Sequence, residues 1–81
     1  MRVTVKFFAI LRERAGISER ILELPDGSTA EAATRLLLEI YPALNEHLPK
    51  SACAVNRAYG PRDTVLHDRD ELALIPPVSG G

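Results

Sequence analysis

The first residues of the chain alternate between apolar and polar side chains. Within residues 2–8 (RVTVKFF), Val3, Val5 and Phe7 share one parity, and the polar residues between them share the other. Because successive side chains of a strand point to opposite faces, this alternation predicts a half-buried strand whose core face carries Val3, Val5 and Phe7. Phe8 breaks the pattern, since it places an aromatic ring on the otherwise polar face.

The next residues predict a short helical turn and a second strand. Residues 11–16 fit a single helical turn that is closed by Gly16, because glycine adopts the left-handed conformation with which many helices end. Residues 18–24 have the apolar spacing of a strand with Leu22 and Leu24 facing inward.

The second half of the chain predicts short extended segments joined by turns. Residues 52–56 indicate a strand with Cys53 and Val55 on one face, and residues 59–61 (Tyr-Gly-Pro) indicate a turn. Two further segments complete the pattern, a brief extended stretch at residues 64–66 and a last apolar strand at residues 72–75.

Between these groups of strands lies the pattern of one amphipathic helix. Ser28, with Glu31 three residues later, fits a capping box at its start. Apolar residues then recur at helical spacing, at Ala33, Leu36, Leu37, Ile40 and Leu44. Pro42 restricts the residue before it, so the helix is expected to end at Tyr41. The order strand, strand, helix, strand, strand predicts an α+β fold in which one mixed sheet packs on one main helix.

Length and charge limit the functions that are open to the chain. Its 81 residues correspond to one domain, which we expect over residues 1–75, with residues 76–81 extending from it. A formal net charge of −1 does not fit the basic surface of a nucleic-acid-binding protein. No segment has the ~18 apolar residues of a membrane span, and the chain begins with a strand pattern and not with a signal peptide. We therefore expect a cytoplasmic protein without nucleic-acid or membrane partners.

The last residues form a stiffened tail. We define the tail as Pro76, Pro77, Val78, Ser79, Gly80 and Gly81. Because proline has no N–H and holds φ at about −65°, the last strand must end at Pro76, and the chain leaves it in an extended direction. At roughly 3.3 Å per residue the tail projects about 20 Å, which is enough to reach into the active site of another protein.

The diglycine at the end of the tail is the strongest functional signal. Without a Cβ, Gly80 and Gly81 can enter a channel too narrow for other residues, and the α-carboxylate of Gly81 is a handle for acyl chemistry. The alternative interpretation is a frayed chain end, where small residues are common. The two prolines at the root favour the functional interpretation, because a frayed end has no need of them.

Other reactive side chains have structural explanations. Cys53 is the one cysteine, so no internal disulfide is expected, and its place on the apolar face of a strand predicts a buried thiol. His47 and His67 lie in predicted loops without a third ligand at a suitable spacing, so we expect no metal site.

Two groups of charged residues admit two interpretations each. Asp68, Asp70 and Glu71 form an acidic turn that is either solvated or able to steer a basic partner. Arg12 and Arg14 are either surface charges or one side of an ion pair across an interface.

Three segments carry a resemblance to a known family. Residues 7–13 (FFAILRE), 54–56 (AVN) and 70–81 (DELALIPPVSGG) resemble the small, sulfur-carrier subunit family of molybdopterin synthase, and the likeness spans the whole chain. The last segment is the most specific, because two prolines and a terminal diglycine rarely coincide. Arg69 departs from the pattern, since the family often has glycine in the turn before the last strand.

The resemblance implies a fold and a chemistry. The fold would be the β-grasp of ubiquitin, with no stably bound cofactor and no catalytic side chain on this chain. A partner similar to ubiquitin-activating enzyme would use ATP and Mg²⁺ to adenylate Gly81, and a sulfur donor would convert the adenylate to a thiocarboxylate. The tail would then enter the large catalytic subunit, with which the chain would form a heterotetramer. There its sulfur would pass to cyclic pyranopterin monophosphate, and two transfers would build the dithiolene that holds molybdenum.

Three apolar residues that we expect to be exposed are candidates for the docking surface: two have outward parity on strands, and the third lies beside a Gly-Pro turn. Phe8, Tyr59 and Ile75 are expected near the base of the tail, and the resemblance implies docking through a hydrophobic patch on this side of the sheet. The alternative is three unrelated surface residues, since scattered exposed apolar side chains are normal.

Two other functions compete with the molybdopterin assignment. The chain could be a sulfur carrier for thiamin or tRNA thiolation, or a ubiquitin-like modifier that is joined to lysines. It could also be an interaction module whose tail is never modified, as in many β-grasp domains. The segment Pro-Pro-Val-Ser before the diglycine favours the molybdopterin pathway over the first of these alternatives.

Overall fold

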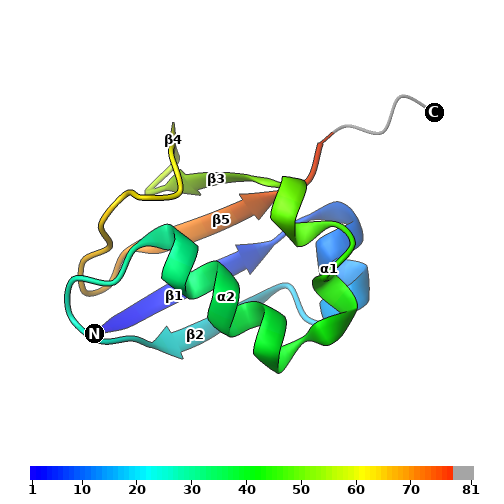
Figure 1. The fold of residues 1–81 in the computed structure, drawn as a ribbon, viewed down its shortest axis with the longest axis horizontal. Coiled ribbons are helices and arrows are strands. Elements are labelled where there is room, and N and C mark those ends of the chain that lie inside the picture. The colour runs from blue at the N-terminus through cyan, green and yellow to red at the C-terminus, as the bar shows by residue number, and fades with distance from the viewer. Residues whose placement is uncertain (78–81) are drawn as a thin grey trace.

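A computed structural model describes residues 1–77 and shows a mixed sheet with one main helix (Figure 1). The strands are β1 (Arg2–Phe7), β2 (Glu19–Glu23), β3 (Ala52–Val55), β4 (Ala58–Gly60) and β5 (Glu71–Ile75). The helices are α1 (Ala9–Ala15) and α2 (Ala30–Ile40), followed by the single 3₁₀ turns η1 (Pro42–Leu44) and η2 (Leu48–Lys50). Residues 78–81 lie outside the described residues, so the predicted division between domain and tail stays a prediction.

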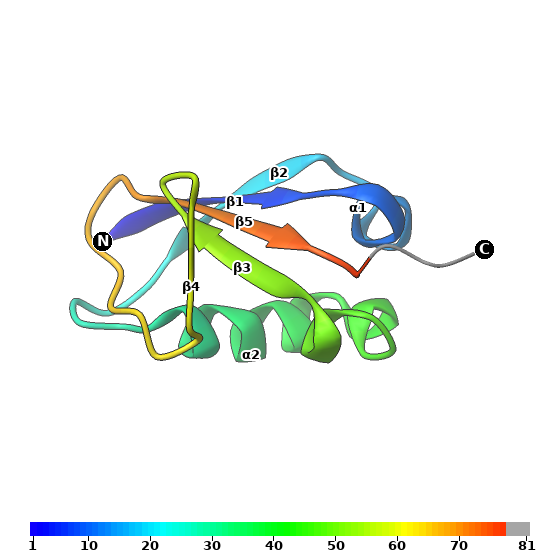
Figure 2. The ribbon, with the colours of Figure 1, turned by 90° about the horizontal axis from the view of Figure 1, so that it is seen from above.

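The sheet has five strands in the order β2-β1-β5-β3-β4. The first and last strands of the chain, β1 and β5, pair in parallel at its centre, whereas β1–β2, β3–β5 and β3–β4 are antiparallel. Figure 2 shows α2 running along one face of this sheet. We call the opposite face the outer face. The arrangement confirms the predicted mixed sheet packed on one helix and the β-grasp architecture.

The hydrophobic core lies between the sheet and α2. Val3, Val5 and Phe7 of β1 face it, with Phe7 only 2% exposed, which confirms the alternation predicted for the first strand. The other fully or nearly fully buried large side chains of the core are Leu11, Leu22, Leu37, Leu44, Leu48, Leu66, Leu72 and Leu74. Leu24 is also buried beyond the end of β2, so both inward positions predicted for the second strand are confirmed.

The start of α2 differs from the predicted capping box. Thr29, not Ser28, is the N-cap, and its hydroxyl accepts a hydrogen bond from the backbone N–H of Ala32 at 3.2 Å. Ser28 instead donates its hydroxyl to the carbonyl of Pro25 at 2.7 Å, which closes the preceding turn. The end of the helix is as predicted: α2 stops at Ile40, and Tyr41 is its C-cap.

The turn predicted at residues 59–61 is wrong. Tyr59 and Gly60 belong to β4, which pairs with β3, and the tight turn lies before β4, at Asn56 and Arg57. Both turn residues have positive φ, 50° and 70°. Such a pair of left-handed residues joins the strands of two-residue hairpins, because its twist matches that of the strands. The pattern Asn-Arg lacks the glycine that normally marks this turn.

The chain between β1 and α1 also differs in detail from the sequence pattern. The strand ends at Phe7, and Phe8 is the extended N-cap residue of α1 with φ −124°. Ala9 follows with φ 51°, a left-handed conformation that is unusual for alanine. Phe8 therefore keeps the outward direction that the alternation predicted, although it lies just past the strand. At the other end of α1, Gly16 is left-handed as predicted, with φ 80°.

Candidate functional site

One row of side chains crosses the outer face of the sheet. In the β1–β5 pairing Lys6 lies beside Ala73, in the β3–β5 pairing Ala73 lies beside Ala54, and in the β3–β4 hairpin Ala54 lies beside Tyr59. The row thus has long side chains at its ends and methyl groups in its middle. A hollow of about 360 Å³ lies over this middle.

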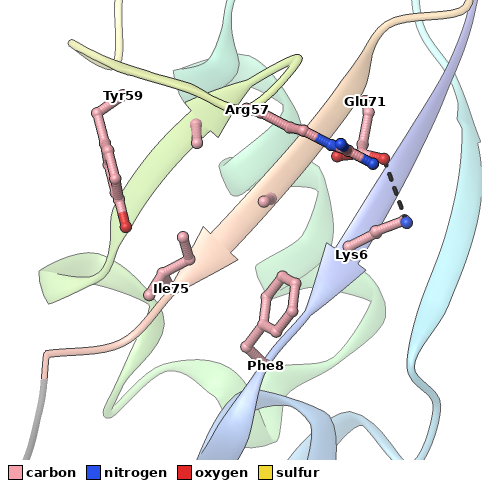
Figure 3. A pocket seen from close by; sticks show the side chains of 8 residues that line it. Lys6, Phe8, Arg57, Tyr59, Glu71 and Ile75 are labelled. Atoms are coloured by element: carbon pink, nitrogen blue, oxygen red, sulfur yellow. Dashed lines mark ion pairs between the residues drawn. The ribbon is translucent and has the colours of Figure 1, made fainter.

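Apolar side chains form one end of the hollow (Figure 3). Phe8 comes from the junction of β1 and α1 and Ile75 from the end of β5, while Tyr59 rises from β4. Phe8 is 43% exposed and Tyr59 71% exposed. The three residues predicted as a docking surface therefore line one hollow, and Ile75 is the residue that immediately precedes the tail.

Charged side chains form the opposite end of the hollow. Lys6 Nζ lies 3.2 Å from Glu71 Oε1, and both side chains are partly exposed. Arg57, which comes from the β3–β4 turn, lines the same hollow as Glu71. Two cations thus stand with one carboxylate at this rim. Exposed ion pairs contribute little to stability, so this group is better suited to orienting a partner than to holding the fold.

Asn56 fixes the β3–β4 turn against the start of β5. Its side chain accepts a hydrogen bond from the backbone N–H of Glu71 at 2.9 Å and donates one to Asp70 at 2.9 Å, and its own N–H donates to the carbonyl of Glu71. These hydrogen bonds need a side chain that both accepts and donates, which explains the asparagine after Ala54 and Val55. The turn that carries Arg57 is thereby held in place relative to β5.

Asp70 belongs to the turn that precedes β5, and its side chain is held by hydrogen bonds from two residues. Besides the bond from Asn56, it accepts a 2.7 Å hydrogen bond from the backbone N–H of His67, and its side chain is 13% exposed. Burial raises the pKa of Asp70, but the hydrogen bonds from Asn56 and His67, together with the nearby His67 imidazole, outweigh burial and hold the pKa below its usual value. Asp70 is thus a structural residue, whereas Asp68 and Arg69 of the same turn are largely exposed.

A second hollow lies at the root of the tail. Pro76 and Pro77 line it together with Ile10 of α1 and with His47 and Lys50 of the loop after α2, and its volume is about 490 Å³. No pattern in the sequence predicts that this loop lies beside the tail.

Arg62 explains how that loop is held. Its guanidinium donates hydrogen bonds to the carbonyls of Leu48, Pro49 and Ser51 at 2.8, 3.1 and 2.8 Å. It also lies 3.6 Å from the carboxylate of Glu31 on α2. One arginine thus fixes η2, and with it Lys50, relative to the rest of the domain.

The remaining candidate side chains show no catalytic arrangement. Cys53 is buried, as predicted, and its thiol donates to the carbonyl of Gly60 at 3.3 Å. His47 lies 3.8 Å from Glu46, and His67 lies 3.8 Å from Asp70. Over residues 1–77 no three His, Cys, Asp or Glu side chains are grouped so as to hold a metal ion. Arg12 is placed in a small hollow with Phe8 and Lys6, and Arg14 is exposed in the last turn of α1.

Sequence reasoning missed several residues of the outer hollow. Ala54 and Ala73, which form its floor, carry no reactive group. Arg57 lies in the β3–β4 turn, and the sequence analysis expected a turn only at residues 59–61. The signal that could have found the alanines is their outward parity, since small apolar residues are unusual where neighbours on the same face are long.

The mixed five-stranded sheet with its parallel central pair and single main helix defines a ubiquitin-like β-grasp protein. The model of the ThiS family matches residues 5–81. The chain belongs to this family. Among curated relatives, the molybdopterin synthase sulfur carrier subunit of Chlamydomonas reinhardtii is 40% identical, and the match covers 100% of both chains.

Solved structures of related proteins share the fold. A chain from the protein–protein complex of subunits 1 and 2 of the molybdopterin-converting factor from Helicobacter pylori is 29% identical, with a TM-score of 0.72 and 100% of both chains covered. The small archaeal modifier protein 1 of Methanosarcina acetivorans is 31% identical, with a TM-score of 0.85 and coverage of 99% of this chain and 96% of that one. Within residues 1–77 no helix has the length and apolar character needed to cross a bilayer.

Proposed function

We propose that this chain is the sulfur-carrier subunit of molybdopterin synthase and is not an enzyme in isolation. The observation that carries the proposal is the full-length likeness to a curated subunit of that name. The geometry supports it, because the hollow lined by Phe8, Tyr59 and Ile75 adjoins the residue from which the tail departs. A partner that covers this hollow is in position to receive the tail.

Gly81 carries the chemistry in this proposal. Its α-carboxylate, with an ordinary pKa of about 3.3 to 3.7, is ionised at neutral pH and is a poor electrophile, so it needs activation. An E1-like adenylyltransferase uses ATP and Mg²⁺ to form the glycyl adenylate, and sulfur from a donor displaces AMP to give the thiocarboxylate. The large subunit then uses this sulfur to convert cyclic pyranopterin monophosphate to the dithiolene. General acid–base groups belong to these partners, and this chain contributes the acyl group.

The tail delivers Gly81 to both partners. Pro76 and Pro77 restrict the backbone at its root, and residues 76–81 at roughly 3.3 Å each span about 20 Å. Gly80 and Gly81 have the smallest cross-section available to a peptide chain, so a narrow channel can admit them and exclude larger residues. The assembly with the large subunit is a heterotetramer.

Reconstitution of molybdopterin synthase with tail variants tests the proposal. Deletion of Gly81 abolishes molybdopterin formation, while thermal melts match those of the unaltered chain because the core lies within residues 1–77. Gly80→Ala lowers the rate of adenylate formation, measured by pyrophosphate exchange, more than the matched change Ser79→Ala does. Wild-type activity without Gly81 would eliminate the carrier mechanism.

A second candidate function is protein modification. The likeness to a small archaeal modifier protein favours it, since the same activated glycine could acylate a lysine amine in place of accepting sulfur. Incubation with the activating enzyme, ATP and cell extract distinguishes the two: a modifier gives isopeptide adducts in mass spectra of tryptic peptides, and a sulfur carrier gives a thiocarboxylate. An unchanged tail under both conditions would instead indicate an interaction module.

A further inference from the structure

Two alanines stand side by side at the centre of the outer face. Ala54 of β3 is paired with Ala73 of β5, and they are 3% and 7% exposed although no core lies above them. The inward-facing residues on either side of Ala73, Leu72 and Leu74, are large and fully buried. In β5 the small side chain, Ala73, therefore stands at the outward position between two large core residues.

Long side chains surround these alanines on every side. Lys6 and Tyr59 stand at the two ends of the row, Phe8 and Ile75 stand on the tail side, and Arg57 with Glu71 stands on the turn side (Figure 3). A floor of two methyl groups inside such a rim makes a socket and not a flat patch. Its volume of about 360 Å³ lies at the small end of the range of ligand pockets, which leaves room for one large side chain.

We propose that this socket receives one large apolar side chain of the large subunit, and that Ala54 and Ala73 are specificity-determining because they keep the socket open. The inference rests on the proposed function and assigns a residue-level docking mode to it. Ile75 lines the socket and Pro76 begins the tail, so the protein that fills the socket also takes up the tail.

The chemistry of the rim specifies what stands beside the inserted side chain. Lys6 pairs with Glu71, and Arg57 lines the same socket, so its charged lining residues are two cations and one carboxylate. A carboxylate next to the inserted apolar residue complements this lining. A central apolar anchor inside a polar rim that excludes water is the arrangement in which a few residues carry most of the binding energy.

The experiment fills the socket with a larger side chain that belongs to this chain. Ala73→Leu, and independently Ala54→Leu, place a branched side chain where the partner's residue would sit. Calorimetric titration against the cognate large subunit is expected to show at least about thirtyfold weaker binding for each, which corresponds to about 2 kcal/mol, the scale of one hot spot. Ala73→Ser, which keeps the socket open, stays within about threefold of wild type.

Matched controls separate docking from general damage. Ala32→Leu adds the same side chain at an exposed position of α2, on the other side of the sheet, and leaves affinity unchanged. Melting temperatures of the Ala73→Leu and Ala54→Leu variants stay near that of wild type, because the added atoms enter open space. For the rim, Arg57→Gln weakens the dependence of affinity on salt concentration, as loss of one charge contact requires.

The possible results are distinct. Normal binding by both folded leucine variants overturns the socket, while the proposed function survives if the wild-type chain binds the large subunit. A wild-type chain that does not bind the large subunit overturns the proposed function and this inference with it. Weak binding by Ala32→Leu as well would also overturn the socket, because the effect would not be local.

Discussion

Replacing each of two neighbouring phenylalanines separates the core from the docking face. Phe7 is 2% exposed, and its ring meets the ring of Tyr41 edge-on at 5.9 Å between centroids. Phe7→Ala is expected to lower the free energy of unfolding by about 3 to 5 kcal/mol, through lost burial and a residual cavity. A domain of this length has about 4 to 12 kcal/mol in total, so this one substitution removes at least about a quarter of the free energy of unfolding.

Phe8→Ala is expected to have the opposite profile. The side chain is 43% exposed, and the backbone bond from the N–H of Leu11 to the carbonyl of Phe8 does not depend on it. The free energy of unfolding changes by about 0.5 kcal/mol or less. Affinity for the large subunit falls by about 2 kcal/mol or more, because the variant loses an aromatic wall of the socket.

Urea unfolding and calorimetric titration of both variants against the large subunit measure the two effects. The two variants serve as controls for each other, since each replaces one phenylalanine by alanine at neighbouring positions. A Phe8→Ala chain that binds normally, or that unfolds as easily as Phe7→Ala, would refute the assignment of the two faces.

Three further predictions concern stability and are measured by urea unfolding. Thr29→Ala destabilises the fold by about 1 kcal/mol through loss of the helix cap, whereas Ser28→Ala costs about 0.5 kcal/mol or less; a larger loss for Ser28→Ala would contradict the capping assignment. Arg69 has φ 69°, so Arg69→Gly relieves left-handed strain and stabilises the chain by about 0.5 to 1 kcal/mol; destabilisation would show that the turn is not strained. The pKa of Asp70 is lowered in the folded chain from 3.8, so its contribution is fully present above that pH and is lost as the pH falls through the folded value. The stability difference between wild type and Asp70→Asn therefore shrinks in acid, and a difference that stays constant down to acidic pH would refute the lowered pKa.

The elements that the sequence predicted correctly are those controlled by local constraints. Alternation at Val3, Val5 and Phe7 sufficed because a slip of one residue would turn all three away from the core. Pro42 set the end of α2 because its ring restricts the residue before it. The full-length resemblance supplied the β-grasp fold. The parallel pairing of β1 with β5 joins the two ends of the domain, and no local pattern encodes it.

The features that the sequence analysis predicted wrongly, the helix cap and the β3–β4 turn, depend on contacts between distant segments. Ser28 and Thr29 are both good helix caps, and the choice between them is made by the bond from Ser28 to Pro25 and by the bridge between Thr29 and Val65. The β3–β4 turn at Asn56 lacks its usual glycine and is held by Glu71, fifteen residues away.

The socket escaped prediction for the same reason. Its floor exists only because the register of β3 on β5 brings Ala54 beside Ala73. Nothing in the sequence of β3 or β5 alone indicates that these two alanines are neighbours. Phe8 and Ile75 could be named from their outward parity and Tyr59 from its place beside Gly60 and Pro61, but the space between the three side chains could not be predicted.

The intact mass of the chain tests the central claim most directly, namely that Gly81 carries sulfur. The chain is incubated with ATP, Mg²⁺, a sulfur donor and an activating enzyme that converts a related sulfur carrier in parallel. The account predicts a mass increase equal to the replacement of one oxygen by one sulfur, located at Gly81 in the C-terminal peptide, and its disappearance once the large subunit and cyclic pyranopterin monophosphate are added. An unchanged mass while the related carrier is converted would contradict it.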